Sequence, residues 1–371
     1  MKSKQPKIII SGGGTGGHIF PAIAIADALK KRFPQAEILF IGAKNRMEMD
    51  RVPKAGYPIE GLWISGFKRS LSLDNLSFPL KLVCSMIKAR KIIKRYKPDV
   101  VIGVGGFASG PTMKTAASLG VPIVIQEQNS YPGITNKIVA NKAAKICVAY
   151  DNMDMWFPKD RIVLTGNPLR NNIVPLEGKE SEARSFFSLD PNKKTILLVG
   201  GSQGALGINL GISAQLASFK ENDYQMIWQT GKPYYDRAVA EVKANGLEDR
   251  IKCTFFIDRM DLAYAAADVV ISRAGAMSIS ELSLLKKAVV FVPLPTAAED
   301  HQTKNAMRLV DANAAMLVKN AETEKELLPK VFELMSNVEQ QKTMETNIAK
   351  FAKPDAAEEI VDQIEMILNK K

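Results

Sequence analysis

Short apolar runs rich in β-branched residues alternate along this chain with longer stretches in which apolar residues recur at helical spacing. The runs that predict strands are residues 7–10, 37–41, 99–102, 121–125 and 145–149 in the first half, and 195–199, 225–229, 251–255, 268–272 and 289–292 in the second. This alternation is typical of parallel α/β architecture. The pattern therefore predicts two doubly wound parallel sheets, one in each half of the chain.

The same sequence of strand, glycine-rich turn and helix occurs twice, about 190 residues apart. The first copy spans residues 7–29, with its turn at Gly12–Gly17, and the second spans residues 196–216, with its turn at Gly200–Gly204. Such a turn places backbone N–H groups and the positive end of a helix at the carboxyl end of a strand, which suits phosphate oxygens. Two copies predict two domains with a cleft between them.

A chain of 371 residues exceeds what one core usually supports. The segment 165–170 combines glycine, asparagine and proline and predicts the hinge, with an N-terminal domain at residues 1–167 and a C-terminal domain at 168–354. Isoleucines recur at helical spacing in residues 355–371. We expect this last helix to pack back on the first domain.

Positive charge is concentrated in the first half, since residues 1–170 hold 26 Lys and Arg against 11 Asp and Glu, and the remainder 24 against 28. Such asymmetry marks a polyanionic partner or an anionic membrane surface, the alternative being lysines kept for solubility. Scattered cysteines, no signal-peptide core and no apolar run that could cross a bilayer favour a cytoplasmic protein, with or without membrane association. The histidines are His18 and His301, and no cluster has metal-ligand spacing, so a protein-held metal is not expected.

The residues near the glycine turns argue against two classes of nucleotide enzyme. A dinucleotide dehydrogenase carries an acid at the end of the next strand to bind the ribose, but those strands end in Gly42-Ala43 and Thr230-Gly231. A P-loop needs Lys and then Ser or Thr after its last glycine, whereas His18 follows Gly17. Hydride transfer is therefore disfavoured and P-loop ATP hydrolysis is excluded.

Three further loops carry candidate chemistry. Gly103–Pro111 gives the basic half a second anion-receptive loop, with tight turns as the alternative reason for its glycines. Arg273–Glu281 is a turn and helix start, where Glu281 can accept two ribose hydroxyls or merely complement the helix dipole. Residues 293–302 form a polar loop that can read sugar hydroxyls.

Six groups of residues occur in the order found in one known family. They are Gly13-Gly14-Thr15-Gly16-Gly17-His18 with Pro21, Gly105-Gly106 with Ser109-Gly110-Pro111, Glu127-Gln128-Asn129, Gly166-Asn167-Pro168 with Arg170, Gly200 to Ala205, and Arg273 to Glu281. Over essentially the whole chain they resemble the MurG family of peptidoglycan glycosyltransferases, which transfer N-acetylglucosamine from UDP-GlcNAc to lipid I and give lipid II. The resemblance implies a GT-B fold, in which two Rossmann-like domains face an interdomain cleft, the N-terminal one for the acceptor and the C-terminal one for the UDP-sugar.

The resemblance also implies binding residues. The donor is expected at Thr15, Gly16, Gly17, Asn129, Arg170, Ser202, Ile257, Ala276, Met277, Ser278, Ile279, Ser280, Glu281 and Gln302. Within this set Ser202 and Arg170 suit phosphate oxygens, Glu281 suits the ribose, the Ile257 backbone suits uracil, and Asn129 and Gln302 suit the sugar. His301 stands where many members carry a second glutamine, which leaves the detail of the sugar contacts in doubt.

The two glycine loops of the first half are expected to face the diphosphate of the lipid acceptor. The residues concerned are Gly13, Gly14, Gly105, Gly106 and Ser109. The reaction implied is a single inverting displacement, with the muramyl 4-hydroxyl as nucleophile and UDP as leaving group. His18 is the candidate general base, because its unperturbed pKa of about 6.5 suits proton transfer near neutrality. The alternative is that His18 only hydrogen-bonds the loop or the donor phosphate. UDP-GlcNAc is then a co-substrate, and no tightly bound cofactor is expected.

A basic and apolar stretch, residues 67–95, is the candidate membrane contact. Its proposed membrane residues are Phe67, Lys68, Arg69, Leu71, Leu73, Leu76, Phe78 and Lys81, whereas Val83 and Ile87 are assigned to the core face of a helix. The protein is accordingly expected at the cytoplasmic face of the cell membrane as a peripheral protein. Partners implied are lipid I, UDP-GlcNAc, an anionic membrane surface and proteins of cell-wall synthesis.

Rival functions remain within and outside this fold class. A diacylglycerol sugar transferase or a UDP-GlcNAc 2-epimerase would share the fold, although His18, Glu127-Gln128-Asn129 and residues 273–281 argue against both. A non-catalytic basic module would explain the charge and not the repeated glycine turn. No aromatic-rich basic motif supports nucleic-acid binding.

Overall fold

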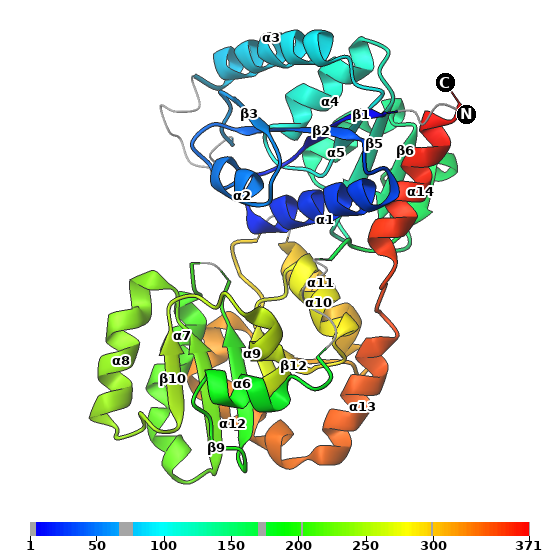
Figure 1. Cartoon of the computed structure of the whole chain (residues 1–371). Helices are drawn as coiled ribbons and strands as arrows, with labels where there is room; N and C mark the ends of the chain where they lie inside the picture. The colour runs from blue at the N-terminus through cyan, green and yellow to red at the C-terminus, as the bar shows by residue number, and fades with distance from the viewer. Residues whose placement is uncertain (1–4, 67–76, 170–175, 202, 298–299, 371) are drawn as a thin grey trace. The chain divides into compact units, whose positions relative to one another are not determined.

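The computed structural model describes residues 5–66, 77–169, 176–201, 203–297 and 300–370. The chain divides into two compact units (Figure 1): unit 1 holds Met1–Arg170 and Lys353–Lys371, and unit 2 holds Asn171–Ala352. The chain therefore leaves unit 1 at the end of the segment 165–170 and returns to it just before its last helix. Each unit is an α/β body built on its own parallel sheet.

The sheet of unit 1 has seven strands in the order β3-β2-β1-β4-β5-β6-β7 among the described residues, and every recorded pairing is parallel. The strands are β1 (Lys7–Ser11), β2 (Glu37–Ala43), β3 (Ile59–Leu62), β4 (Val100–Gly103), β5 (Ile123–Glu127), β6 (Lys145–Val148) and β7 (Ile162–Leu164). The central strands are buried on both faces, which is why they read as continuous apolar runs in the sequence. The carboxyl ends of β1 and β4, which carry the two glycine loops, are neighbours in this order.

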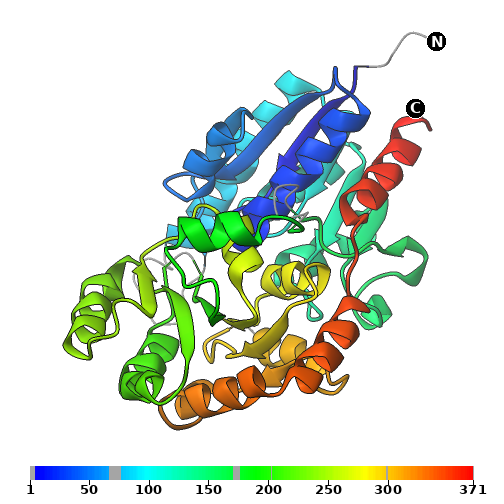
Figure 2. The same cartoon turned by 60° about the horizontal axis from the view of Figure 1, so that its bottom comes forward.

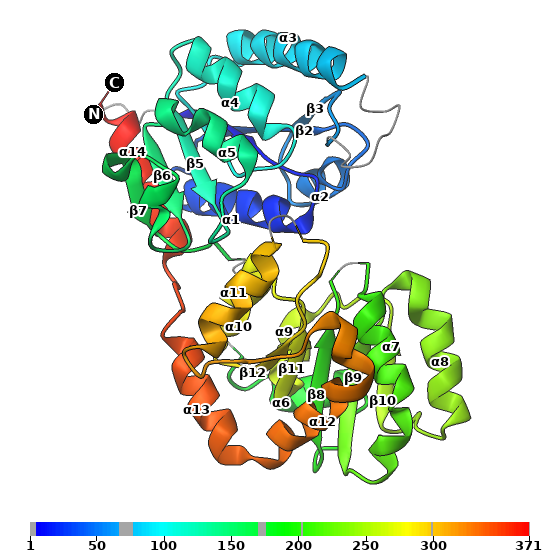
Figure 3. The ribbon, with the colours of Figure 1, turned by 180° about the vertical axis from the view of Figure 1, so that it is seen from behind.

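Helices cover both faces of this sheet. They are α1 (Gly16–Arg32), α2 (Glu48–Lys54), α3 (Phe78–Tyr96), α4 (Ser109–Ser118), α5 (Ile134–Val139) and α14 (Ala356–Leu368), with short 3-10 turns at Ala140–Lys142, Met153–Met155 and Lys159–Arg161. One hydrophobic core lies under α1 and α14, and the other lies under α3 and α4. Figure 3 shows α3, α4 and α5 in succession on the second face.

The last helix, α14, completes the core of unit 1. Its buried side chains include Ile360, Val361, Ile364 and Leu368, which join the core that α1 also lines. At its edge Arg32 of α1 forms ion pairs with Asp362 and Glu365, and these exposed pairs stabilise less than the apolar contact does. Figure 2 shows this red helix among the elements of unit 1, after the orange helices of unit 2.

The sheet of unit 2 has six parallel strands in the order β10-β9-β8-β11-β12-β13 among the described residues. The strands are β8 (Lys194–Val199), β9 (Tyr224–Gln229), β10 (Ile251–Thr254), β11 (Val269–Ser272), β12 (Ala288–Phe291) and β13 (Met316–Leu317). The helices are α6 (Glu180–Phe186), α7 (Leu206–Ala214), α8 (Tyr235–Ala244), α9 (Met260–Ala266), α10 (Ala276–Leu284), α11 (His301–Val310), α12 (Thr323–Ser336) and α13 (Val338–Ala349). Two hydrophobic cores flank this sheet as well.

The two doubly wound parallel sheets expected from the sequence are confirmed, and every predicted strand is present. Three strands were not predicted, β3, β7 and β13, and each lies at the edge of its sheet. An edge strand is buried less completely, so a run of two to four residues there carries no strong apolar signal. The predicted loop at 293–302 is wrong at its end, because α11 already begins at His301 and its first turn includes Gln302.

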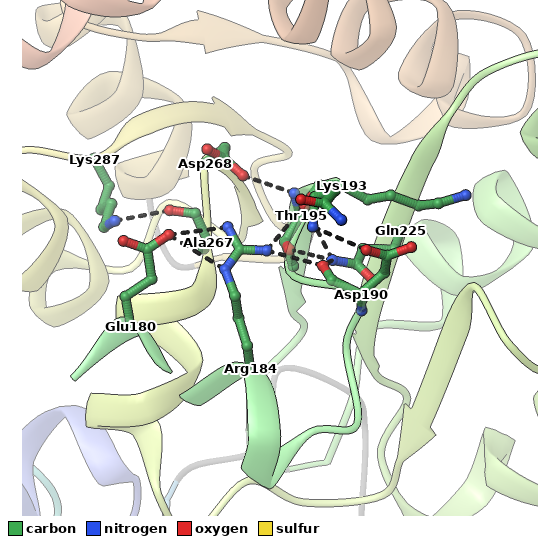
Figure 4. Close-up of polar contacts among 10 residues, drawn as sticks. Glu180, Arg184, Asp190, Lys193, Thr195, Gln225, Ala267, Asp268 and Lys287 are labelled. Carbon is green, nitrogen blue, oxygen red and sulfur yellow. Dashed lines mark hydrogen bonds and ion pairs between the residues drawn. The ribbon is translucent and has the colours of Figure 1, made fainter. Parts of the chain in front are cut away.

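Polar contacts tie down the amino-terminal edge of the sheet in unit 2 (Figure 4). The Arg184 guanidinium donates to the carbonyls of Asp190 and Lys193, and the Asp268 carboxylate accepts from the Thr195 N–H at 2.7 Å. Lys287, whose pKa is lowered by burial, donates to the Ala267 carbonyl at 2.7 Å. The amino-terminal edge of this sheet is therefore held together by the protein's own side chains.

Candidate functional site

A pocket of about 730 Å³ lies at the carboxyl-terminal edge of the sheet in unit 2. Its walls come from the glycine turn after β8, the turn before α10, the segment after β12 and the first turn of α11. Among the predicted donor residues, Ser278 and Gln302 line it, together with Gly200, Gly201 and Arg273. Ligands of open α/β sheets bind at this position, so the structure brings the second glycine turn and part of the Arg273–Glu281 motif into one site.

The beginning of α10 presents an electropositive end to this pocket. Gly275 is the residue before the helix and contributes no side chain to cap it, and both Gly275 and Ser278 line the pocket. The Arg273 guanidinium donates to the Val292 and Pro293 carbonyls, each at 3.0 Å, and burial lowers its pKa to about 10. A helix start beside a cation favours a phosphate group.

The remaining predicted donor residues of unit 2 differ in what they can offer. Ile257 and Ile279 are core side chains, 6% and 3% exposed, so only their backbone can meet a ligand. The Ser280 hydroxyl donates to the Ala276 carbonyl within α10. The Glu281 carboxylate accepts from the Tyr264 hydroxyl at 3.2 Å. Met277 is half-buried in the first turn of α10.

Close backbone contacts explain the glycines around this pocket. Gly204 and Gly231 both have positive φ, and a Cβ at Gly204 would lie 2.0 Å from the Thr230 carbonyl oxygen. The Gln229 side chain accepts from the Gly200 N–H at 3.0 Å and donates to the Gly201 carbonyl at 2.8 Å. Gly200, Gly201 and Gly204 of this turn are therefore held by contacts with residues at the end of β9 and just after it.

In unit 1 the first glycine loop leads into α1, whose first turn contains no acidic residue. Thr15 precedes the helix in an extended conformation, and its hydroxyl lies 3.3 Å from His18 Nδ1. Thr15 and Gly17 are exposed, while Gly16 and His18 are half-buried. This geometry presents the imidazole and the start of α1 together at the carboxyl end of β1.

The second glycine loop packs directly against the first. A Cβ at Gly106 would lie 2.1 Å from the Gly13 carbonyl oxygen, and a Cβ at Gly105 would lie 2.9 Å from the His18 ring. The Ser109 side chain, at the start of α4, is fully buried, and its hydroxyl has no hydrogen-bond partner among the described residues. Of the residues predicted for the acceptor diphosphate, the structure thus brings Gly13, Gly105 and Gly106 together beside His18.

Glu127 explains the position of Asn129. The Glu127 carboxyl group is 2% exposed and accepts from the Asn129 N–H, the Gly133 N–H and the Asn136 side chain at 3.0, 3.0 and 2.8 Å. Burial raises the pKa of this group, while the hydrogen bonds oppose the shift. Glu127 therefore fixes the loop after β5, and the Asn129 side chain belongs to the same network, because it donates to Glu127 at 3.3 Å.

Several predicted residues lie outside the described part of the chain. They are the donor residues Arg170 and Ser202 and the membrane residues Phe67, Lys68, Arg69, Leu71, Leu73 and Leu76. Phe78 and Lys81 are described and lie in the first turn of α3. The remaining predicted site residues occupy the positions given above.

The first half of α3 presents an apolar face to solvent. Leu80, Val83 and Ile87 are 59%, 54% and 53% exposed and share one face of the helix, whereas Ser85 and Ala89 are buried. The assignment of Val83 and Ile87 to the core face is therefore wrong. The exposed residues and the buried residues both recur at helical spacing, so the sequence alone could not show which face of α3 packs on the rest of the protein.

Within the described ranges, no group of three or more His, Cys, Asp or Glu side chains is arranged to hold a metal ion. No helix of the described chain has the length and apolar character needed to cross a membrane.

Comparison with known proteins identifies the family to which this chain belongs. Residues 8–148 match the N-terminal domain of glycosyltransferase family 28, and residues 195–360 match its C-terminal domain. The UDP-N-acetylglucosamine--N-acetylmuramyl-(pentapeptide) pyrophosphoryl-undecaprenol N-acetylglucosamine transferase of Parabacteroides distasonis is 55% identical over 369 residues, 99% of this chain and 100% of the relative. The chain belongs to glycosyltransferase family 28. The family 28 relative of the same name from Cytophaga hutchinsonii is 52% identical, over 100% of this chain and 99% of its own length.

Solved structures agree with the family 28 assignment. The crystal structure of MurG from Acinetobacter baumannii has a TM-score of 0.77 at 29% identity, covering 97% of this chain and 99% of that one. The fold is accordingly GT-B. A UDP-GlcNAc 2-epimerase from Neisseria meningitidis has a TM-score of 0.69 at 16% identity, over 97% and 100% of the two chains, and shares the fold alone.

Two side chains of the candidate site were missed from the sequence. Arg273 was noted only as the start of a motif, although its place after β11 and before a helix was a usable signal. Glu48 accepts from the Gly14 N–H at 2.9 Å, yet nothing in the sequence relates it to a loop 34 residues earlier.

Proposed function

We propose that this protein is the N-acetylglucosaminyltransferase that converts lipid I to lipid II. It transfers N-acetylglucosamine from UDP-GlcNAc to the 4-hydroxyl of undecaprenyl-pyrophosphoryl-N-acetylmuramyl-pentapeptide. The observation that carries this proposal is the 55% identity to a transferase of that name over 99% of this chain and 100% of the relative. The pocket at the start of α10 supports the same reading, because its helix end and Arg273 suit a nucleotide diphosphate.

The proposed step is one inverting displacement at the anomeric carbon. The muramyl 4-hydroxyl attacks and loses its proton, the bond from the anomeric carbon to the UDP oxygen breaks, and UDP leaves. We assign His18 as the group that takes the proton. The start of α10 and Arg273 stabilise the negative charge that develops on UDP. In this proposal the nucleotide needs no metal held by the protein.

Transfer of labelled N-acetylglucosamine from UDP-GlcNAc to a lipid I analogue tests the proposal. A labelled lipid II product with release of one UDP per transfer is the expected result. Transfer to diacylglycerol, or formation of UDP-N-acetylmannosamine without an acceptor, would instead identify one of the rival enzymes of the same fold.

Glu281 is the proposed ribose ligand, and its loss should weaken UDP binding. Replacing Glu281 with glutamine should raise the dissociation constant for UDP about tenfold or more, because a charged hydrogen bond contributes about 1.5–3 kcal/mol. Titration calorimetry should also show that the variant no longer distinguishes UDP from 2′-deoxy-UDP.

The matched control is Tyr264→Phe, which removes the hydroxyl that donates to Glu281 and leaves the carboxylate in place. This variant should still prefer UDP over the deoxy nucleotide. A Glu281→Gln protein that kept the full preference would contradict the ribose assignment.

We further propose that the protein acts as a peripheral protein at the cytoplasmic face of the cell membrane, where its polyprenyl-linked acceptor lies. The exposed apolar face of α3 and the excess of cations in the first half support this location. Lys81 stands beside that face, with its ammonium group 3.2 Å from the Ser65 hydroxyl. Binding to proteins of cell-wall synthesis is a further expectation of this location.

Substitutions on α3 test the membrane proposal. Changing Leu80, Val83 and Ile87 together to serine should weaken binding to anionic vesicles on the order of 100-fold. Each of these half-exposed side chains would no longer bury apolar surface in the lipid. Lys81→Glu should weaken it on the order of tenfold. Co-sedimentation with phosphatidylglycerol vesicles measures both effects.

Val338→Ser is the matched control, because Val338 is 48% exposed and belongs to unit 2. It should leave vesicle binding unchanged. Equal binding by the wild-type protein and the α3 variants would refute the assignment of this face.

A further inference from the structure

A buried carboxyl group, that of Glu48, accepts a hydrogen bond from the first glycine loop. Glu48 is the first residue of α2 and is 1% exposed. One carboxyl oxygen accepts from the Gly14 N–H and the other from the Ala43 N–H, each at 2.9 Å. A single side chain therefore joins the end of β2 to the loop between β1 and α1.

The space around Glu48 is shaped to admit this side chain. A Cβ at Gly13 would lie 2.2 Å from a Glu48 carboxyl oxygen, and a Cβ at Gly42 would lie 2.6 Å from its Cγ. Gly13 and Gly14 also have positive φ, a conformation that glycine adopts without strain. The glycines at 13 and 42 are thus required by the carboxyl group that lies between them.

The loop that Glu48 fixes is in turn in contact with His18. The Gly13 carbonyl packs on Gly106, where a Cβ would lie 2.1 Å away, and a Cβ on the adjacent Gly105 would lie 2.9 Å from the His18 ring. A displacement of Gly13 and Gly14 would therefore move both the start of α1 and the loop against which the imidazole rests.

Burial of this carboxyl group is costly and is not offset by a cation. Across the described ranges, the structure records no ion pair to Glu48, and its recorded hydrogen bonds come from two backbone N–H groups. An apolar side chain would avoid the desolvation cost but could not hold the Gly14 N–H. Glu48 is therefore better explained as a side chain that fixes the position of the glycine loop than as one that stabilises the fold.

We propose that Glu48 is a positioning residue for the transfer step. It holds the first glycine loop so that His18 meets the acceptor hydroxyl, and it occupies the Gly14 N–H, which is then not a ligand of the acceptor diphosphate. The proposal rests on the function proposed above for the kinetic part of its test, and on the structure alone for the spectroscopic part.

Glu48→Gln keeps the shape of the side chain and turns an NH2 group toward one of the two N–H donors. In the full-length protein this variant should lower kcat on the order of 10- to 100-fold, as a small misplacement of a reacting group does. The dissociation constant for UDP should stay at the wild-type value. The matched control is Asp50→Asn, which removes an exposed acid from the same helix, where Asp50 pairs with Lys54.

The NMR signals of the imidazole rings distinguish a positioning role of Glu48 from a purely structural one. A purely structural role of Glu48 would leave the His18 signals unchanged in the variant. The chain has two histidines, His18 in unit 1 and His301 in unit 2, so histidine-labelled protein gives two sets of resonances. Glu48→Gln should shift the His18 resonances and the pH at which they titrate, and should leave those of His301 unchanged. Asp50→Asn should leave both sets at their wild-type positions.

Wild-type kcat together with unmoved His18 resonances in a folded Glu48→Gln protein would overturn the proposal, as would a lower kcat with unmoved resonances. If the wild-type protein showed no transfer at all, the proposed function would fail while the resonances still decided the role of Glu48. If Glu48→Gln did not fold, Gly13→Ala would displace the same carboxyl group from the other side, and the same two readouts apply.

Discussion

Replacing His18 with alanine should lower turnover about 100-fold or more when lipid I and UDP-GlcNAc are both saturating. The expected loss follows from removing the group that we propose takes the proton of the muramyl 4-hydroxyl, while the proposed nucleotide pocket of unit 2 is untouched. Steady-state kinetics with a lipid I analogue measures the effect. The dissociation constant for UDP should remain at the wild-type value.

A second substitution separates a base from an orienting residue. His18→Gln can still hydrogen-bond the Thr15 hydroxyl, which lies 3.3 Å from His18 Nδ1, but it cannot accept a proton near neutral pH. A base requires that alanine and glutamine lose activity alike, and that the acidic limb of the pH profile of kcat/KM disappear in both. A loss below tenfold in His18→Ala would rule out the base and leave the orienting role.

Ile364→Ala should reduce the free energy of unfolding of unit 1 by about 2–5 kcal/mol, the usual range for truncating a large buried side chain. Ile364 is fully buried in the core that α14 and α1 share. Urea unfolding followed by circular dichroism measures the loss as a fall in the denaturation midpoint. The free energy of UDP binding should change by less than the free energy of unfolding.

Met366 supplies the matched control on the same helix. It is 54% exposed, so Met366→Ala should change the free energy of unfolding by no more than about 0.5 kcal/mol. If the two substitutions were equally mild, α14 would not be an integral part of unit 1.

The sequence predicted the central strands of both sheets because those strands are buried on both faces and read as unbroken apolar runs. It missed β3, β7 and β13, where an edge position removes that signal. The exposed face of α3 was likewise misassigned, since helical spacing shows that a face is apolar and not whether anything covers it.

For the candidate site, glycine turns and polar motifs near strand ends were visible in the sequence, and the structure gathers them at the carboxyl-terminal edge of each sheet. The roles of their supporting side chains were not visible, even for Glu127, which belongs to one of the motifs. Glu48, Gln229 and Glu127 act by accepting hydrogen bonds from the backbone of loops, and no local pattern relates such an acceptor to a distant N–H. Positioning groups of this kind are found only after the fold is known.

The place of α14 also sets an order of assembly during synthesis. Unit 2 is inserted between the main part of unit 1 and the helix that completes it. A ribosome adding roughly 5–20 residues per second needs on the order of ten to forty seconds to make the roughly 180 residues of unit 2. Throughout that interval the part of the α1 core that α14 covers is exposed. The half of the protein that is made first is therefore the half that finishes folding last, and nascent chains stalled within unit 2 are the ones that chaperones would be expected to bind.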